Sequence, residues 1–165
     1  MELTMKSALL FGAVTLTGLS AGFFYAWAVS VIPGNLKVVD EVYLPTMQSI
    51  NREILNPSFF LVFFGSLILM AIATIYQYGS GATFWLMLAA TAIYLVGTFG
   101  VTAFGNVPLN DQLDVLDLAG LTPAKMQEFR THYEIKWNKL HTIRTVFSVA
   151  SFLSALLAVF TSANS

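Results

Sequence analysis

The sequence predicts an all-α integral membrane protein, a four-helix bundle with a small cap of loops and a short helix on one side. The 165-residue chain is 56% hydrophobic and only 10% charged, whereas soluble domains are roughly 25% charged. Residues 54–110 contain no Asp, Glu, Lys, Arg or His, and residues 7–36 and 145–165 carry no charge either. Soluble proteins place charge on every wet face, so we expect hydrocarbon to surround these stretches.

Four segments are long enough to cross a bilayer, at about 8–32, 57–77, 83–104 and 141–161. A spanning helix needs about 20 mainly apolar residues to cross roughly 30 Å of hydrocarbon. The length allows one domain, residues 1–165. The first segment is too long for the apolar core of a signal peptide and lacks a basic leader, so we expect no cleavage there.

The first two connections carry clear boundary signals. Pro33-Gly34-Asn35 ends the first span, and Asn56-Pro57 begins the second. Between them, residues 36–56 predict a short amphipathic helix. Its apolar face holds Tyr43, Met47, Ile50 and Ile54 at helical spacing.

The later connections complete the predicted bundle and cap. Tyr78-Gly79-Ser80-Gly81 is a tight turn, so spans two and three are predicted to be antiparallel neighbours. Gly105-Asn106-Val107-Pro108 ends the third span, and 109–121 is predicted to be a loop. Thr122-Pro123 then predicts the start of a helix that continues into span four. The cap therefore comprises 36–56 and 105–135.

An even number of spans puts both termini on one side and both long connections on the other. The basic residues of the connections are Lys37, Arg52, Lys125, Arg130, Lys136, Lys139 and Arg144, against Lys6 on the terminal side. The positive-inside rule favours cytoplasmic connections, although acidic residues are interleaved with them. No basic patch indicates nucleic acid, so the expected partners are the lipid bilayer and an apolar or aromatic small molecule. The sequence gives no oligomeric state.

The fourth span has a short apolar part. Residues 145–160 cover about 24 Å as a helix, less than the roughly 30 Å required. Either the bilayer thins there, or His141 and Arg144 lie at the hydrocarbon boundary. Ionisable groups at that depth usually face the bundle interior and are paired, whereas the alternative is an arginine that snorkels to the headgroups.

Polar residues converge at this end of the bundle. Two stripes on the fourth helix comprise Glu134, Asn138, His141 and Thr145, and beside them Trp137, Leu140 and Arg144. A stripe on the third comprises Tyr94, Thr98, Thr102 and Asn106. Tyr25, Trp27 and Asn51 are expected nearby. Helix packing, including that of Gly18-x-x-x-Gly22, or an aromatic belt would explain each residue alone, but their convergence predicts a pocket.

We expect neither a metal nor another cofactor. The chain has no cysteine and only two histidines. His132 and His141 are nine residues apart, so they point to opposite sides of a continuous helix.

Four motifs occur in an order that resembles the anthrone oxygenase-like family of small four-span membrane proteins, long catalogued as a domain of unknown function. They are Gly22-Phe-Phe-Tyr-Ala-Trp27, Met47-Gln-Ser-Ile-Asn51 with Leu55-Asn-Pro57, Phe104-Gly-Asn-Val-Pro-Leu-Asn110 and Trp137-Asn-x-x-His-Thr-x-Arg144. The resemblance covers about residues 10–160. Many members have a basic or imidazole residue directly after the Trp-Asn pair; here that residue is Lys139, and the histidine follows at 141.

The resemblance implies a monooxygenase that oxidises an anthrone to a quinone with molecular oxygen, without metal or flavin. His141 would be the base, because an imidazole pKa near 6.5 suits proton abstraction at neutral pH. Asn138, Asn106 or Arg144 would steady the oxyanion. Tyr25, Trp27 and Trp137 would stack on the rings, and Asn51, Thr98 and Thr102 would complete the substrate pocket.

A second class of function stays open. The chain could be a non-enzymatic membrane protein that binds a lipid, a quinone or another apolar small molecule, or a scaffold subunit. A channel or pump is disfavoured, because no acidic residue lies within a span. An enclosed pocket that gathers His141, Asn138 and Asn106 would favour the enzyme.

Overall fold

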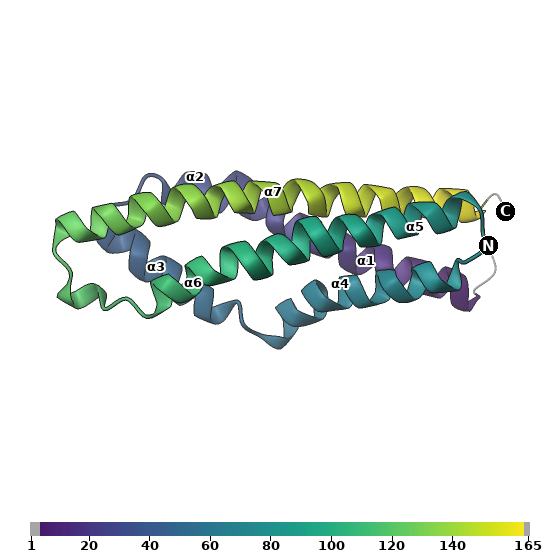
Figure 1. Cartoon of the computed structure of the whole chain (residues 1–165), viewed down its shortest axis with the longest axis horizontal. Helices are drawn as coiled ribbons and strands as arrows, with labels where there is room; N and C mark the ends of the chain where they lie inside the picture. Colours follow the sequence, from purple (N-terminus) through teal and green to yellow (C-terminus); the bar gives the residue numbers. More distant parts are fainter. Residues whose placement is uncertain (1–3, 164–165) are drawn as a thin grey trace.

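The computed structural model describes residues 4–163, and this part of the chain is all-α, as predicted. Its long helices run side by side in one elongated bundle, with both chain ends at the same end (Figure 1). Four helices of the described part are long and apolar enough to cross a membrane: Met5–Asn35, Pro57–Tyr76, Ala82–Asp114 and Pro123–Ser162. The predicted multi-pass membrane architecture is confirmed.

Two of the long helices, the first and third spans, are interrupted by π-helical segments, here labelled η1 to η3. The elements in order are α1 (Met5–Ala26), η1 (Trp27–Val31), α2 (Ile32–Asn35), α3 (Asp40–Glu53), α4 (Pro57–Tyr76), α5 (Ala82–Ile93), η2 (Tyr94–Gly100), η3 (Thr102–Asn106), α6 (Val107–Asp114), the 3-10 turn η4 (Leu118–Gly120) and α7 (Pro123–Ala163). The first span therefore ends at Asn35 and the amphipathic helix follows it, both as predicted.

Side-chain caps and glycines set the predicted boundaries. Asn56 caps α4, because its side-chain oxygen accepts a hydrogen bond from the Phe59 N–H at 2.9 Å, and Pro57 occupies the first turn. Gly79 and Gly81 have φ values of 80° and 57°. This left-handed backbone favours glycine and joins α4 to α5 as antiparallel neighbours. α7 begins at Pro123 and continues unbroken into the fourth span, as predicted.

The third span is longer than predicted. The sequence placed its end at 105–108 and a loop over 109–121, but the helix continues through Pro108 to Asp114 as α6. Pro108 lies in the first turn of α6, directly after η3. A proline lacks a backbone N–H and is tolerated in the first turn of a helical segment, here where the π-helical pattern of η3 gives way to α6. The loop prediction is wrong for residues 109–114.

Two clusters of buried side chains form the core, one in the membrane half of the molecule and one in the cap half. In the membrane half the cluster is made largely of small and flexible side chains, namely Leu10, Ala13, Met70, Ala73, Met87, Ala90, Tyr94, Ala155 and Ala158. Small residues let spanning helices approach closely. In the cap half the cluster comprises Tyr43, Leu44, Met47, Leu109, Leu113, Tyr133 and Trp137. Burial of Tyr43 raises the pKa of its hydroxyl, which therefore stays protonated.

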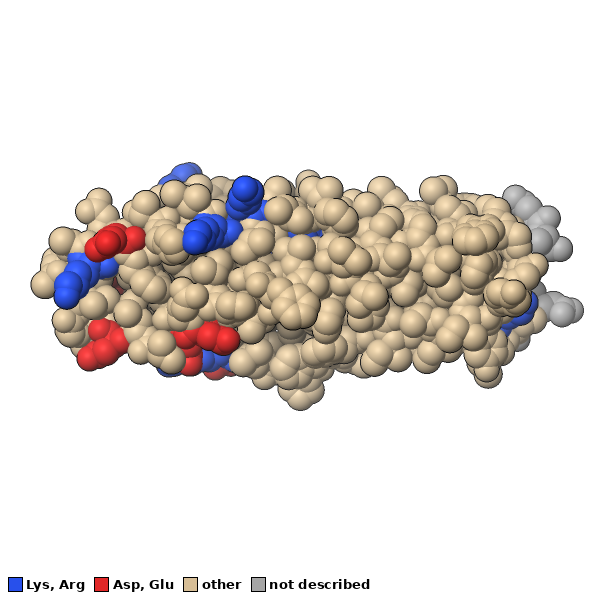
Figure 2. Space-filling model, viewed as in Figure 1, with Lys and Arg blue, Asp and Glu red and all other residues tan. Residues whose placement is uncertain are grey.

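Charge is segregated along the long axis. Figure 2 shows acidic and basic side chains around the cap end, a long uncharged surface, and basic atoms again at the end that carries the termini. The uncharged surface carries many exposed apolar side chains, such as Phe11, Ile68, Trp85 and Leu157. In water such a surface would aggregate, so its solvent is the bilayer.

Candidate functional site

A pocket lies at the junction of the bundle and the cap, between α1, α3, α4, α6 and α7. It contains about 560 Å³ of empty space, part of it open to the surroundings. Its aromatic walls are Phe23, Phe24, Trp27, Phe59 and Trp137, and its polar lining is Asn51, Thr102, Asn110, His141 and Arg144. Apolar walls with a few convergent polar groups are typical of sites for small aromatic ligands.

His141 and Arg144 form a buried pair, one turn apart on α7. The Nε and Nη2 atoms of Arg144 lie 3.1 and 2.9 Å from Nδ1 of His141. A guanidinium can only donate, so Nδ1 is the acceptor and the imidazole proton is on Nε2. That proton is donated to the carbonyl oxygen of Phe24 at 3.0 Å. The indole of Trp137 stacks on the imidazole with ring centroids 5.1 Å apart. The tautomer and orientation of His141 are thereby fixed.

Arg144 has no carboxylate partner among residues 4–163. Its side chain is buried, and the residue is only 8% exposed. Besides His141 it reaches the Thr102 hydroxyl at 3.4 Å and lies over the rings of Phe24 and Trp137 at 4.7 and 5.1 Å. A guanidinium has five N–H donors, more than these contacts use. A buried positive charge without a counter-ion is costly, so the pocket favours an anionic or strongly polarised oxygen.

The π-helical segment η1 shapes the α1 side of the pocket. η1 begins at Trp27, whose N–H bonds to the carbonyls of Phe23 and Phe24. The Phe24 carbonyl also accepts from Nε2 of His141 on α7. π-helical turns occur frequently at functional sites.

A hydrogen-bonded chain fixes the cap side of the pocket. The side-chain oxygen of Asn110 accepts from the Trp137 indole N–H at 2.8 Å and from the Tyr133 hydroxyl at 3.4 Å. Asn51 in turn donates to the Tyr133 oxygen at 3.2 Å. These hydrogen bonds thus join α3, α6 and α7 around one wall of the pocket. Asn110 and Tyr133 were not among the predicted site residues.

The predicted polar stripe of the third span faces the interior of the bundle. Tyr94, Thr98, Thr102 and Asn106 are all buried, although a strict repeat of four residues drifts around a helix of 3.6 residues per turn. The wider turns of η2 and η3 absorb this drift. Only Thr102 of the four lines the pocket. Asn106 donates to the Trp137 carbonyl at 3.2 Å, and its side-chain oxygen, like the Thr98 hydroxyl, is buried without a partner in the described chain.

The pocket gathers six of the ten predicted site residues: Trp27, Asn51, Thr102, Trp137, His141 and Arg144. Asn106 and Thr98 are buried but do not line it. Asn138 faces a small hollow on the cap side, beside Tyr43 and Met47. Tyr25 is 57% exposed on the outside of α1, as an aromatic belt would explain.

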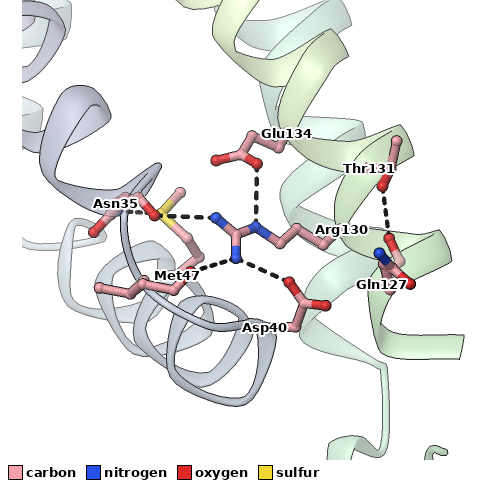
Figure 3. Close-up of polar contacts among 8 residues, drawn as sticks. Asn35, Asp40, Met47, Gln127, Arg130, Thr131 and Glu134 are labelled. Carbon is pink, nitrogen blue, oxygen red and sulfur yellow. Dashed lines mark hydrogen bonds and ion pairs between the residues drawn. The ribbon is translucent and has the colours of Figure 1, made fainter. Parts of the chain in front are cut away.

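In the cap half of α7 the buried residues next to the pocket include Tyr133, Trp137, His141 and Arg144, and Glu134 lies beside them. Glu134 instead accepts from Arg130 at 3.1 Å. Figure 3 shows Arg130 at the centre of a clasp. Its guanidinium also binds the Asp40 carboxylate at 2.9 Å and the carbonyls of Asn35 and Val38 at 3.1 and 2.6 Å. This clasp holds the segment between α2 and α3 against α7, and so positions the cap over the pocket.

No three His, Cys, Asp or Glu side chains come together as a metal site within residues 4–163. His132 is exposed on α7 while His141 is buried, as their spacing predicts.

Among the comparisons with known proteins, one gives a match. The family model described as anthrone oxygenase matches residues 58–154, which is more than half of the chain. The matched segment includes Thr102, Asn110, Trp137, His141 and Arg144, while Trp27 and Asn51 lie before it. No curated protein matches, and no solved structure matches. On the family match, the chain belongs to the anthrone oxygenase family.

Proposed function

We propose that this protein oxidises an anthrone-like aromatic substrate to the quinone with molecular oxygen. The observation that carries the proposal is Arg144, a buried cation with no carboxylate partner in the described chain, hydrogen-bonded to a buried histidine inside an aromatic pocket. An anthrone becomes an oxyanion when it loses its C10 proton, so it supplies the charge that this pocket lacks.

Binding would use the aromatic walls. The rings of Trp27 and Trp137 come from different helices, with centroids 6.2 Å apart. Offset or edge contacts with such rings favour a flat tricyclic molecule. The substrate's carbonyl oxygen would face Arg144, and Asn106 and Asn138, which do not line the pocket, are not needed for that role.

Proton removal is assigned to His141. In the structure Arg144 donates to the Nδ1 lone pair of His141. Substrate binding would draw the guanidinium donors to the carbonyl oxygen and release that lone pair to accept the C10 proton. Charge developing on the oxygen would be stabilised by Arg144 as the proton leaves. Substrate binding would thus free His141 to act as the base and, in the same step, place Arg144 against the oxygen that becomes negatively charged.

The remaining steps balance without another reductant. The carbanion–enolate gives one electron to O₂, and the resulting radical pair combines to form a C–O bond at C10. Protonation gives a hydroperoxide. Loss of the second C10 hydrogen with cleavage of the O–O bond then gives the quinone carbonyl and one water. The residues' part is to bind, to hold the oxyanion and to move the first proton.

The test follows quinone absorbance when emodin anthrone is added to the purified protein in lipid nanodiscs. We expect a rate well above spontaneous autoxidation. His141→Asn keeps an oxygen that can accept from Arg144 but has no titratable base, so we expect at least a hundredfold loss. The matched control is His132→Ala, which changes the exposed histidine and should leave the rate unchanged. A wild-type rate equal to autoxidation, or full activity in His141→Asn, would remove the proposal.

The same buried cation also supports a second candidate, a protein that binds an aromatic anion or a quinone without converting it. Anthraquinone binding by the wild type, with no oxygen consumed when the anthrone is added, would favour this alternative.

A further inference from the structure

A second hollow lies on the bilayer side of the molecule, between α1 and α4. It contains about 710 Å³ of empty space, part of it open to the surroundings. Its outer rim includes Leu19 and Phe23, which are 55% and 40% exposed, and its floor is the buried side of Phe63. We call this hollow the α1–α4 groove.

The groove and the site pocket are separated by a single layer of side chains. Four residues line both hollows: Phe23, Phe24, Ile54 and Phe59. Phe24 is held in place, because it is 1% exposed and contacts both His141 and Arg144. Phe23 and Phe59 are the outer pair, with ring centroids 5.8 Å apart across the two helices. The Phe23 side chain is 40% exposed, so its ring is not enclosed on the outer side.

The depth of the groove suits a molecule dissolved in the membrane. It extends along α4 from Asn56, where the span begins, to Phe63. Seven residues correspond to about 10 Å of helix, so the groove opens into the outer part of the hydrocarbon layer. Flat aromatic molecules with a polar oxygen concentrate near this interface for the same reason that Trp and Tyr side chains do.

On the cap side a smaller hollow, about 180 Å³ of empty space, also reaches Trp27 and Trp137. The cap core otherwise closes this side with Tyr43, Leu44, Met47 and Leu113, each no more than 2% exposed. The Arg130 clasp fastens that core to α7. The groove itself contains no charged side chain, so it has nothing to hold a lipid phosphate. Its polar side chains include Ser20, which is bonded to Tyr94, and Asn56, which caps α4.

We propose that the α1–α4 groove is the entrance through which a flat apolar aromatic substrate passes from the bilayer into the site pocket, with Phe23 and Phe59 as the movable side chains between the two hollows. The identity of the substrate rests on the function proposed above. The route itself rests on the shared walls and on the packed core of the cap.

The absence of cysteine from the chain allows a clean test. Phe23→Cys with Phe59→Cys places one thiol pair across the groove, which a short bis(methanethiosulfonate) reagent can link through two disulfide bonds. In vesicles that carry emodin anthrone in the bilayer, we expect linking to slow oxidation at least tenfold and reductant to restore the rate. The control pair is Gly12→Cys with Leu69→Cys, which joins α1 to α4 nearer the terminal end. Linking that pair should not change the rate.

A second readout needs no turnover. Trp27 and Trp137 line the pocket, so their fluorescence in a Trp85→Phe background should be quenched by anthraquinone delivered in lipid. Linking across the groove should slow this quenching. Slowed quenching in the linked protein, without any oxidation of the anthrone, would support the proposed entrance and contradict the proposed reaction. Oxidation or quenching that proceeds equally fast in the linked protein, or no quenching in either state, would overturn the entrance.

A plug variant covers the case in which the cysteine pair fails to fold. Ser58→Phe adds an aromatic ring at the exposed rim of the groove, away from His141 and Arg144, without adding a tryptophan to the fluorescence signal. We expect slower quenching and slower oxidation with an unchanged elution profile. Unchanged rates in this variant would count against the groove as the route.

Discussion

At the scale of single residues, Arg144 is better suited to binding a ligand than to stabilising the fold. A buried ion pair adds little stability, and an unpaired buried charge lowers it. Arg144 has only an imidazole, a hydroxyl and two ring faces around it. The stability of the bundle must therefore come from other contacts.

We expect the double variant His141→Leu, Arg144→Met to be inactive yet no less stable than the wild type. Both polar partners are removed together, so neither is left buried and unsatisfied. The Phe24 carbonyl keeps its backbone bond from the Trp27 N–H. The measurement is the midpoint of thermal unfolding in detergent, beside the anthrone assay. A midpoint many degrees below that of the wild type would show that the pair holds the fold together.

The sequence revealed part of this site because ionisable residues are conspicuous in an apolar stretch. His141 and Arg144 were found that way. Asn110 was missed, since a loop was predicted where α6 continues, although it lies four residues after Asn106 and belongs to the same motif. Tyr133 was missed because one more aromatic residue in an amphipathic helix gives no signal. Tyr25 shows the reverse, an aromatic residue near the right depth that faces outward.

At the scale of helices, close approach and π-helical turns together set the geometry of the site. A side chain at Gly97 in η2 would overlap the Phe147 ring on α7, and one at Gly105 would meet Leu140 at 3.0 Å. The two helices therefore touch on both sides of Thr102 and Arg144. The strict four-residue repeat from Tyr94 to Asn106 was visible in the sequence, but the π turns that keep it on one face were not predicted.

Gly97→Ala should separate these helices. Overpacking of this kind costs about 1–3 kcal/mol, so we expect a lower unfolding midpoint and reduced activity, with partial rescue by Phe147→Leu. The control is Gly22→Ala, because nothing lies within 4 Å of the added Cβ there and alanine favours a helix. That variant should be as stable as the wild type or slightly more stable. Equal midpoints for Gly97→Ala and the wild type would contradict the close contact.

At the scale of the whole molecule, charge segregation fixes the depth of the site. From Arg144 to the end of α7 at Ala163 the helix rises about 28 Å, close to the roughly 30 Å of a hydrocarbon core. Arg144 then lies near the cap-side boundary of the hydrocarbon, one of the two explanations considered from the sequence. The bundle, its antiparallel order and the apolar spans follow from composition and turn signals. The cap packing does not, because it depends on long-range contacts such as that between Arg130 and Asp40.

The Arg130 clasp should be needed for the cap to stay closed. Arg130→Met leaves the largely buried carboxylate of Glu134 and that of Asp40 without their cation. Removing one partner of a buried ion pair costs on the order of 3 kcal/mol. We expect a lower unfolding midpoint and faster proteolysis of the connection between α2 and α3.

The matched control for this change is Arg52→Met. Arg52 pairs with Asp114 at 2.5 Å, but their side chains are 61% and 47% exposed. Exposed pairs contribute about 0–1 kcal/mol, so the unfolding midpoint should move little. Equal effects of the two substitutions would show that the clasp is an ordinary surface contact.

The missing counter-ion of Arg144 has a consequence for how a catalytic cycle would end. In the proposed reaction the intermediate is an anion, whereas the finished quinone carries no formal charge. Conversion would therefore cancel the attraction that retained the molecule, and Arg144 would return to the imidazole of His141. The protein would tend to release its product into the surrounding lipid, because the quinone would bind less tightly than the anionic intermediate.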